Sequence, residues 1–182
     1  MQSKAVAKLL ALYVFASLPL AAAAAVYYSK EEAMELAFGK DAEVESLPVF
    51  LTEEQIGQIE KTAQVKLEGG LFTFFQGKKQ GKVLGYAAIE SHTVRTQPET
   101  ILIVLSPAGE LVRSEMLAFH EPPEYQPPGR WFERLYRRPL EELRLNQGVD
   151  GIAGATLSSR ASLDSIRKTL AVYRIARPEG VQ

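Results

Sequence analysis

Residues 150–160 (DGIAGATLSSR) gather, in one short segment, residue types that can bind or carry a ligand. Small side chains let a backbone approach a ligand closely, and the hydroxyl groups of Thr156, Ser158 and Ser159 can bind a phosphate or be esterified by one. The apolar residues that follow have helical spacing, at Leu163, Ile166, Leu170 and Tyr173. This pattern predicts a long helix that begins at Thr156 or Leu157.

The predicted start of this helix has two interpretations. A helix N-terminus presents unpaired backbone N–H groups and about half a positive charge, which together favour a phosphate, and Thr156 would lie where that phosphate rests. A threonine at such a position is also typical of a plain N-cap, which stabilises a helix by about 1 kcal/mol. Taken alone, the segment leaves both interpretations open.

In its wider setting, the segment resembles the attachment motif of the FMN-binding domain family. This family occurs in the flavin-carrying subunits of the Rnf and Na+-translocating NADH:quinone oxidoreductase complexes and in smaller exported FMN-binding proteins. Its motif is Asp, two variable residues with Gly often first, Ser or Thr, Gly, Ala and Thr, and this chain has Asp150-Gly151-Ile152-Ala153-Gly154-Ala155-Thr156. In the family, the last threonine bears FMN through a phosphoester bond that an exported flavin transferase forms.

The resemblance therefore implies FMN as the cofactor, covalently bound to Thr156, and a flavin transferase as the maturation partner. It also implies further cofactor-binding residues in and after the motif: Asp150, Gly151, Gly154, Ala155 and Ser158. One position departs from the pattern, because Ala153 stands where the family has Ser or Thr and removes a hydroxyl that could bind the phosphate or aid recognition by the transferase. Ser158 and Ser159 are the fallback acceptors.

The similarity covers roughly residues 82–172 and includes a proline-rich loop, FHEPPEYQPPGRWF at residues 119–132. It implies that this loop meets the motif at the flavin, where Tyr125 or Trp131 would stack on the ring and His120 or Glu121 would hydrogen-bond its polar edge. From the residues alone, a rigid cover over the core is the favoured interpretation of the aromatic side chains in this loop. His92 is expected to be structural.

The composition excludes several other kinds of redox site. The chain has no cysteine and only two histidines, so we expect no thiolate-held cluster and no metal site, and redox chemistry would need an organic cofactor. The 21 basic and 22 acidic residues nearly cancel, which argues against nucleic acid as a partner.

The N-terminal segment, residues 1–25, has the pattern of a signal peptide or a membrane anchor. Lys4 and Lys8 precede an apolar stretch from Leu9 to Leu20, and the alanines from Ala21 onward suit signal-peptidase cleavage. A retained span is the alternative, since the segment from Leu9 to Val26 is close to the minimum length for crossing a bilayer. Either case predicts a periplasmic or otherwise extracytoplasmic protein, membrane-associated if the segment is kept.

Periodicity along the remaining chain predicts an α+β fold. Capping boxes begin two helices, at residues 30–38 and after Thr52, so residues 26–68 are expected to form an N-terminal helical segment. Residues 69–178 are the expected FMN-binding domain. Its β-rich runs predict an antiparallel sheet of about four or more strands in sequential hairpins, with the helices packed on one face.

Three functions follow as hypotheses. The first is an exported FMN-binding electron-transfer protein that shuttles electrons between membrane-side and extracytoplasmic redox partners. The second is a flavin-dependent reductase of a small extracytoplasmic acceptor, whose pocket could use His120, Glu121, Arg95 and Arg130. The third is a flavin-free binding or assembly module of the same fold, which Ala153 favours.

Overall fold

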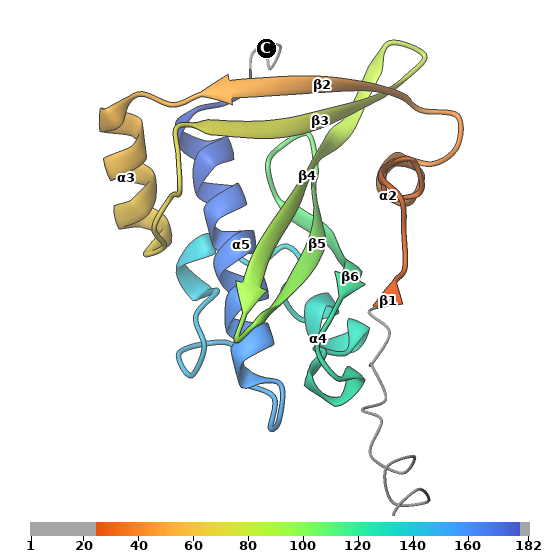
Figure 1. The fold of residues 1–182 in the computed structure, drawn as a ribbon. Coiled ribbons are helices and arrows are strands. Elements are labelled where there is room, and N and C mark those ends of the chain that lie inside the picture. Colours follow the sequence, from red (N-terminus) through yellow and green to blue (C-terminus); the bar gives the residue numbers. More distant parts are fainter. Residues whose placement is uncertain (1–24, 179–182) are drawn as a thin grey trace, which may run out of the picture.

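A six-stranded antiparallel sheet with helices on both faces forms the centre of the computed structural model, which describes residues 25–178 (Figure 1). The strands, in the order of the sheet, are β1 (Ala25–Val26), β6 (Leu111–Phe119), β5 (Gln97–Leu105), β4 (Lys82–Val94), β3 (Leu71–Lys79) and β2 (Glu43–Phe50). The helices are α2 (Lys30–Phe38), α3 (Glu53–Ala63), α4 (Gly129–Glu133) and α5 (Thr156–Ile175), with short 3-10 turns η1 (Pro123–Tyr125) and η2 (Leu140–Glu142). This architecture confirms the predicted α+β class.

Strands β3 to β6 are joined as sequential hairpins, as the β-rich runs predicted. The longest ladder joins β4 and β5, from Tyr86 opposite Leu105 to Val94 opposite Gln97. Its far end projects toward the start of α5 (Figure 1). The expected signal or anchor segment, residues 1–25, lies outside the described residues except for Ala25. No helix within residues 25–178 combines the length and apolar character needed to cross a bilayer.

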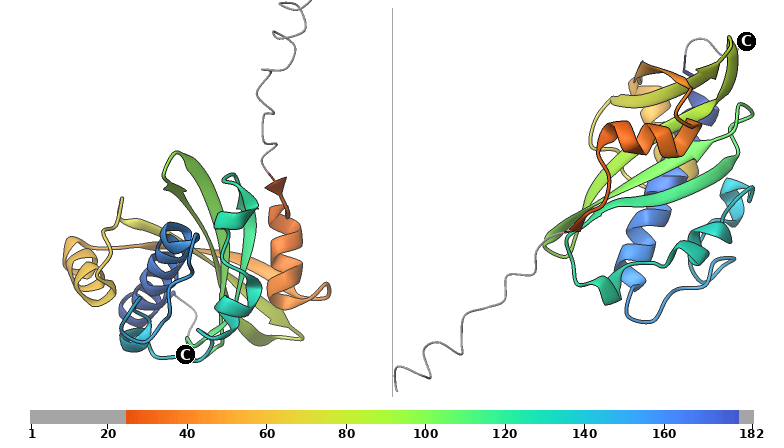
Figure 2. Two further views of the ribbon diagram at one scale, coloured as in Figure 1. Left: turned by 90° about the horizontal axis from the view of Figure 1, so that it is seen from below. Right: turned by 90° about the vertical axis from the view of Figure 1, so that its right-hand side faces the viewer.

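The helices cover both faces of the sheet, so the prediction that they cover one face is wrong (Figure 2). Successive strand residues point to opposite faces, and each face has its own core. On one face, α3 and α5 pack against residues that include Phe74, Ile101 and Ile103. On the other, α2 contributes Ala33 and Met34 to a smaller cluster. Leu36, Ala37 and Phe38 of α2 pack against the same cluster. The apolar spacing of a helix predicts that one of its sides is buried, but it does not say which face of the sheet covers that side.

Strand β2 lies in the segment that was expected to be helical, and this part of the prediction is wrong. The two helices are present, and both have complete capping boxes, at Ser29 and at Thr52. Between them, residues 43–50 pair with β3 along their whole length. Most of β2 is exposed at the edge of the sheet, where Pro48 is tolerated because an edge strand needs fewer backbone donors. Its sequence therefore lacks the apolar alternation that marks a half-buried strand.

Candidate functional site

Helix α5 begins at Thr156, as predicted, but Thr156 is its first residue rather than its N-cap. The N-cap is Ala155, which has no side chain able to accept from the first turn. The Thr156 hydroxyl donates instead to the backbone carbonyl of Ile152, at 3.1 Å between oxygen atoms. The plain N-cap interpretation is therefore wrong, and the first backbone N–H groups of the helix receive no side-chain cap.

The motif lies at the surface, and its threonine is accessible. Gly151, Ala153, Gly154 and Thr156 are all exposed. The two serines that could replace Thr156 as acceptors are buried, with Ser158 2% and Ser159 0% exposed. The Ser159 hydroxyl donates to the Ala155 carbonyl at 2.8 Å. Thr156 thus has the one exposed hydroxyl between residues 150 and 160.

The two motif glycines differ in what the backbone requires of them. Gly154 has φ +86°, a left-handed conformation that costs any residue with a Cβ about 1–2 kcal/mol. A Cβ at Gly154 would lie 3.8 Å from the Glu124 carbonyl oxygen of η1, while one at Gly151 would meet no atom within 4 Å. The two glycines therefore add no bulk beside Thr156.

The proline-rich loop and the motif lie together at one end of the molecule, as the family resemblance implied. The Trp131 indole N–H donates to the Asp150 carbonyl at 2.9 Å, and Gly154 lies against Glu124. The Arg95 guanidinium, from the β4–β5 turn, stacks 4.4 Å from the centroid of the Tyr125 ring. The motif, the proline-rich loop and the β4–β5 turn lie far apart in the sequence, and these contacts hold them together before the start of α5.

The four side chains expected at the flavin ring have different surroundings. Trp131 is only 4% exposed and packs edge-on against Phe132, with ring centroids 5.1 Å apart, so its ring belongs to the core. Tyr125, His120 and Glu121 are partly exposed. The Oε1 atom of Glu121 is buried without a hydrogen-bond partner among the described residues. The structure therefore leaves Tyr125 as the aromatic residue beside the motif with an accessible surface.

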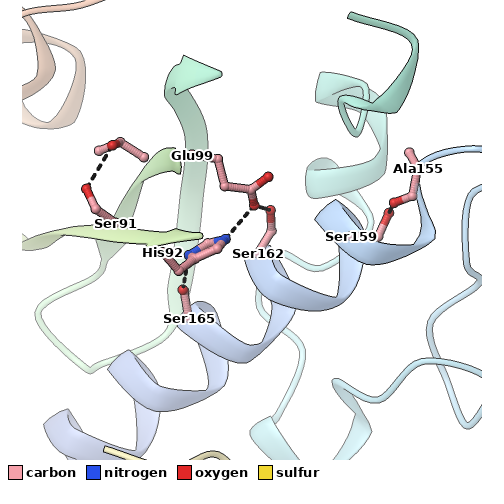
Figure 3. A network of polar contacts seen from close by, with 8 residues as sticks. Ser91, His92, Glu99, Ala155, Ser159, Ser162 and Ser165 are labelled. Carbon is pink, nitrogen blue, oxygen red and sulfur yellow. Dashed lines mark hydrogen bonds and ion pairs between the residues drawn. The ribbon is translucent and has the colours of Figure 1, made fainter. Parts of the chain in front are cut away.

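A buried polar network attaches the first half of α5 to the sheet (Figure 3). Glu99, 1% exposed, lies opposite His92 in the β4–β5 ladder, and its Oε1 is 2.5 Å from His92 Nε2. Ser162 donates to the same carboxylate oxygen at 3.2 Å, and Ser165 Oγ lies 3.1 Å from His92 Nδ1. These bonds fix the position of α5 along its own axis and its rotation about that axis. His92 therefore has a structural role, as expected.

Two features near Thr156 were not predicted from the sequence. Leu157 is 49% exposed beside the threonine, although a leucine in a predicted amphipathic helix is expected to be buried. Arg95 was considered only as a pocket residue for a reductase, whereas its contact with Tyr125 joins the hairpin to the loop. Its positive φ of 53° marks a tight turn, but a single non-glycine residue gives no such signal in sequence.

Four grooves on the described residues lie away from this site, against β2, α3, the β5–β6 turn and the C-terminal half of α5. None of these four is lined by residues 150–156. Within residues 25–178, no three histidine or acidic side chains are grouped as metal ligands.

Comparison with described protein families and with curated proteins finds no match for this chain. The family resemblance therefore depends on the residues of the motif and of the proline-rich loop, and on the order in which they occur.

Proposed function

We propose that this chain is an exported electron-transfer protein that carries FMN through a phosphoester bond on Thr156. The observation that supports the proposal best is the exposed hydroxyl of Thr156, at the first residue of a 20-residue helix with no side-chain cap. A nucleotide phosphate esterified at this oxygen would lie beside the N-terminal amides of α5, which favour negative charge.

The residues before Thr156 fit the phosphate end of FMN. The left-handed Gly154 turns the chain, the exposed Gly151 and Ala153 add no bulk, and the bond from Trp131 holds the Asp150 carbonyl. FMN, when bound, supplies the capacity to accept and donate electrons, and the protein's contribution is to hold and orient it. Leu157, directly after the motif, offers exposed apolar surface, and Tyr125 of the neighbouring loop is half-buried.

The exposed position of the motif supports electron transfer between proteins over catalysis on a small substrate. A reductase needs a pocket that encloses its acceptor against the flavin, whereas a carrier needs its cofactor near the surface that a redox partner touches. Thr156 and its neighbours Gly154 and Leu157 are exposed. The expected partners are a flavin transferase for maturation and membrane-side and extracytoplasmic redox proteins for turnover.

A covalent bond suits the extracytoplasmic location that the N-terminal pattern predicts. Free FMN is scarce outside the cytoplasm, and a noncovalent complex loses its cofactor once the free concentration falls below the dissociation constant. An ester on the ribityl phosphate prevents this loss and leaves the isoalloxazine ring unmodified.

Mass spectrometry of the protein co-expressed with an exported flavin transferase tests the proposal. We expect an FMN-sized addition on the peptide that contains Thr156, absent in Thr156→Ala and retained in Thr156→Ser. Thr169→Ala is the matched control, since it removes a buried threonine hydroxyl of α5 that is likewise bonded to the carbonyl four residues before it, and it should leave the modification intact.

The other outcomes separate the alternatives. An unmodified native chain, under conditions that modify a positive-control flavoprotein, would contradict the proposal and favour the flavin-free module. Modified protein that rapidly reduces a small acceptor with an artificial electron donor would instead favour the reductase.

A further inference from the structure

Arg167 is a buried cation without adequate partners. It lies in the middle of α5 and is only 6% exposed, yet its Nε and Nη2 atoms have no hydrogen-bond partner among the described residues. A guanidinium carries five N–H donors and stays charged in proteins. Burying such a group unpaired costs several kcal/mol, so buried charges are normally paired.

A second arginine in the same region is also unsatisfied. Arg144 follows η2, and its Nε atom is buried without a partner within the described part of the chain. Burial lowers the pKa of Arg167, and the nearby charge of Arg144 lowers it further. Two adjacent like charges with free donors repel each other unless an anion lies between them.

The acidic residues of the neighbouring elements do not supply that anion. Glu141 accepts a hydrogen bond from Arg174 at 2.6 Å and is exposed. Asp164 lies one turn before Arg167 on α5 and opposes the lowering of its pKa, but burial raises the pKa of Asp164 itself. The donors of Arg167 that lack partners are not bonded to either carboxylate.

Solvent reaches Arg144 through a groove of about 500 Å³ between α3, η2 and the end of α5. Lys61 and Thr62 of α3 also line the groove, as does Glu141, whose carboxylate is paired with Arg174. Arg144 is the member of the arginine pair that lines the groove, so a small anion entering it would meet Arg144 first.

We propose that the crevice between α3, η2 and α5 is a second binding site, for a phosphate or carboxylate group held by Arg144 and Arg167. Planar guanidinium groups bind both kinds of anion through paired N–H donors. The site does not depend on flavin at Thr156, which lies eleven residues earlier on α5, about 16 Å along the helix axis at 1.5 Å per residue.

Thermal unfolding of the full chain in inorganic phosphate, and separately in acetate, tests this site, with sodium chloride of equal ionic strength as the reference. We expect one of the two anions to raise the Tm in a saturable manner, and the preferred anion then identifies the ligand as a phosphoryl or a carboxylate compound. Arg167→Met should abolish the shift, and Arg144→Met should weaken the apparent affinity at least tenfold.

Arg160→Met is the matched control, because Arg160 is an exposed arginine on the same helix and should keep the full shift. If Arg167→Met does not fold, Arg144→Met decides the matter, because its side chain is partly exposed. Equal shifts in the native protein and in both variants, or no shift of the native protein with either anion, would overturn the proposal. Thr156→Ala should keep the shift, so the two proposals can fail separately.

Discussion

The indole N–H of Trp131 donates to the backbone carbonyl of Asp150, at 2.9 Å. This bond joins a residue of the main core to the first residue of the exposed motif. The motif is thus held by a rigid aromatic side chain at one end and by helix α5 at the other, although most of its residues are exposed.

Trp131→Phe should loosen the motif. The variant keeps an aromatic ring in the core but removes the hydrogen bond, whose net contribution is about 1 kcal/mol. We expect a small loss of stability in urea unfolding together with slower flavin attachment. Tyr136→Phe is a suitable comparison, because it removes the contacts of the tyrosine hydroxyl with the Ser114 backbone, away from the motif. Equal attachment rates in the two variants would show that the bond to Asp150 is not needed for modification.

The two motif glycines should respond differently to alanine. Gly154→Ala places a Cβ on a residue with φ +86° and should cost about 1–2 kcal/mol. Gly151→Ala meets open space without a positive φ and should be neutral or slightly stabilising, because alanine restricts the unfolded chain. Thermal unfolding of both variants measures the contrast. A Gly154→Ala protein as stable as Gly151→Ala would contradict the conformation described for the motif.

Ala153→Ser restores the hydroxyl that the family motif has at this position. The side chain is exposed, so the fold should tolerate the change with less than about 0.5 kcal/mol of effect. We expect a higher fraction of flavin-modified protein by intact mass at early times of co-expression. Ala161→Ser, on the partly buried side of α5, serves as the control and should leave the fraction unchanged. A lower fraction in Ala153→Ser would show that the alanine suits this chain's own transferase.

His92→Ala should destabilise the attachment of α5 to the sheet. It leaves the buried carboxylate of Glu99 with one side-chain hydrogen bond among the described residues, the one from Ser162. Hydrogen bonds to charged groups contribute about 1.5–3 kcal/mol, and we expect a loss of this size in urea unfolding. Ser91→Ala removes the exposed contact with Thr100 on the same strand and should cost much less. Equal losses would mean that the His92–Glu99 contact contributes little.

Glu60 gives a pH-dependent prediction. The hydrogen bond from Lys66 and then the one from the Leu67 backbone lower the pKa of Glu60 from its model-compound value of 4.5. Since its pKa is lower in the folded state, Glu60 stabilises the fold above the unfolded-state pKa, and this contribution is lost as the pH falls through the folded-state pKa. Glu60→Gln should therefore have a lower Tm than the native protein at pH 7, with the difference shrinking below pH ~4.5. In a Lys66→Met background the same substitution should change the Tm less at pH 7, because the bond that contributes most to the lowered pKa is already absent.

Local signals predicted the parts of the fold that depend on local interactions. The capping boxes at Ser29 and Thr52 begin helices because their bonds lie within four residues, and the start of α5 follows from the spacing of its apolar face. Strand β2 could not be predicted, because an exposed edge strand needs no apolar alternation. The core position of Trp131 agrees with the interpretation from composition, that aromatic residues in a proline-rich loop pack over the core, and not with a place on the flavin ring.

Strand β1 places the start of the described chain beside the proline-rich loop. Ala25 lies opposite Phe119, one residue before His120, and the Tyr27 hydroxyl donates to Gln126 of the proline-rich loop at 3.1 Å. The polypeptide therefore enters the described fold beside the loop that holds the motif. Anything attached to the chain before Ala25, whether a lipid surface or another protein, would therefore stand at the end of the fold that carries the motif, where a docking partner would meet it.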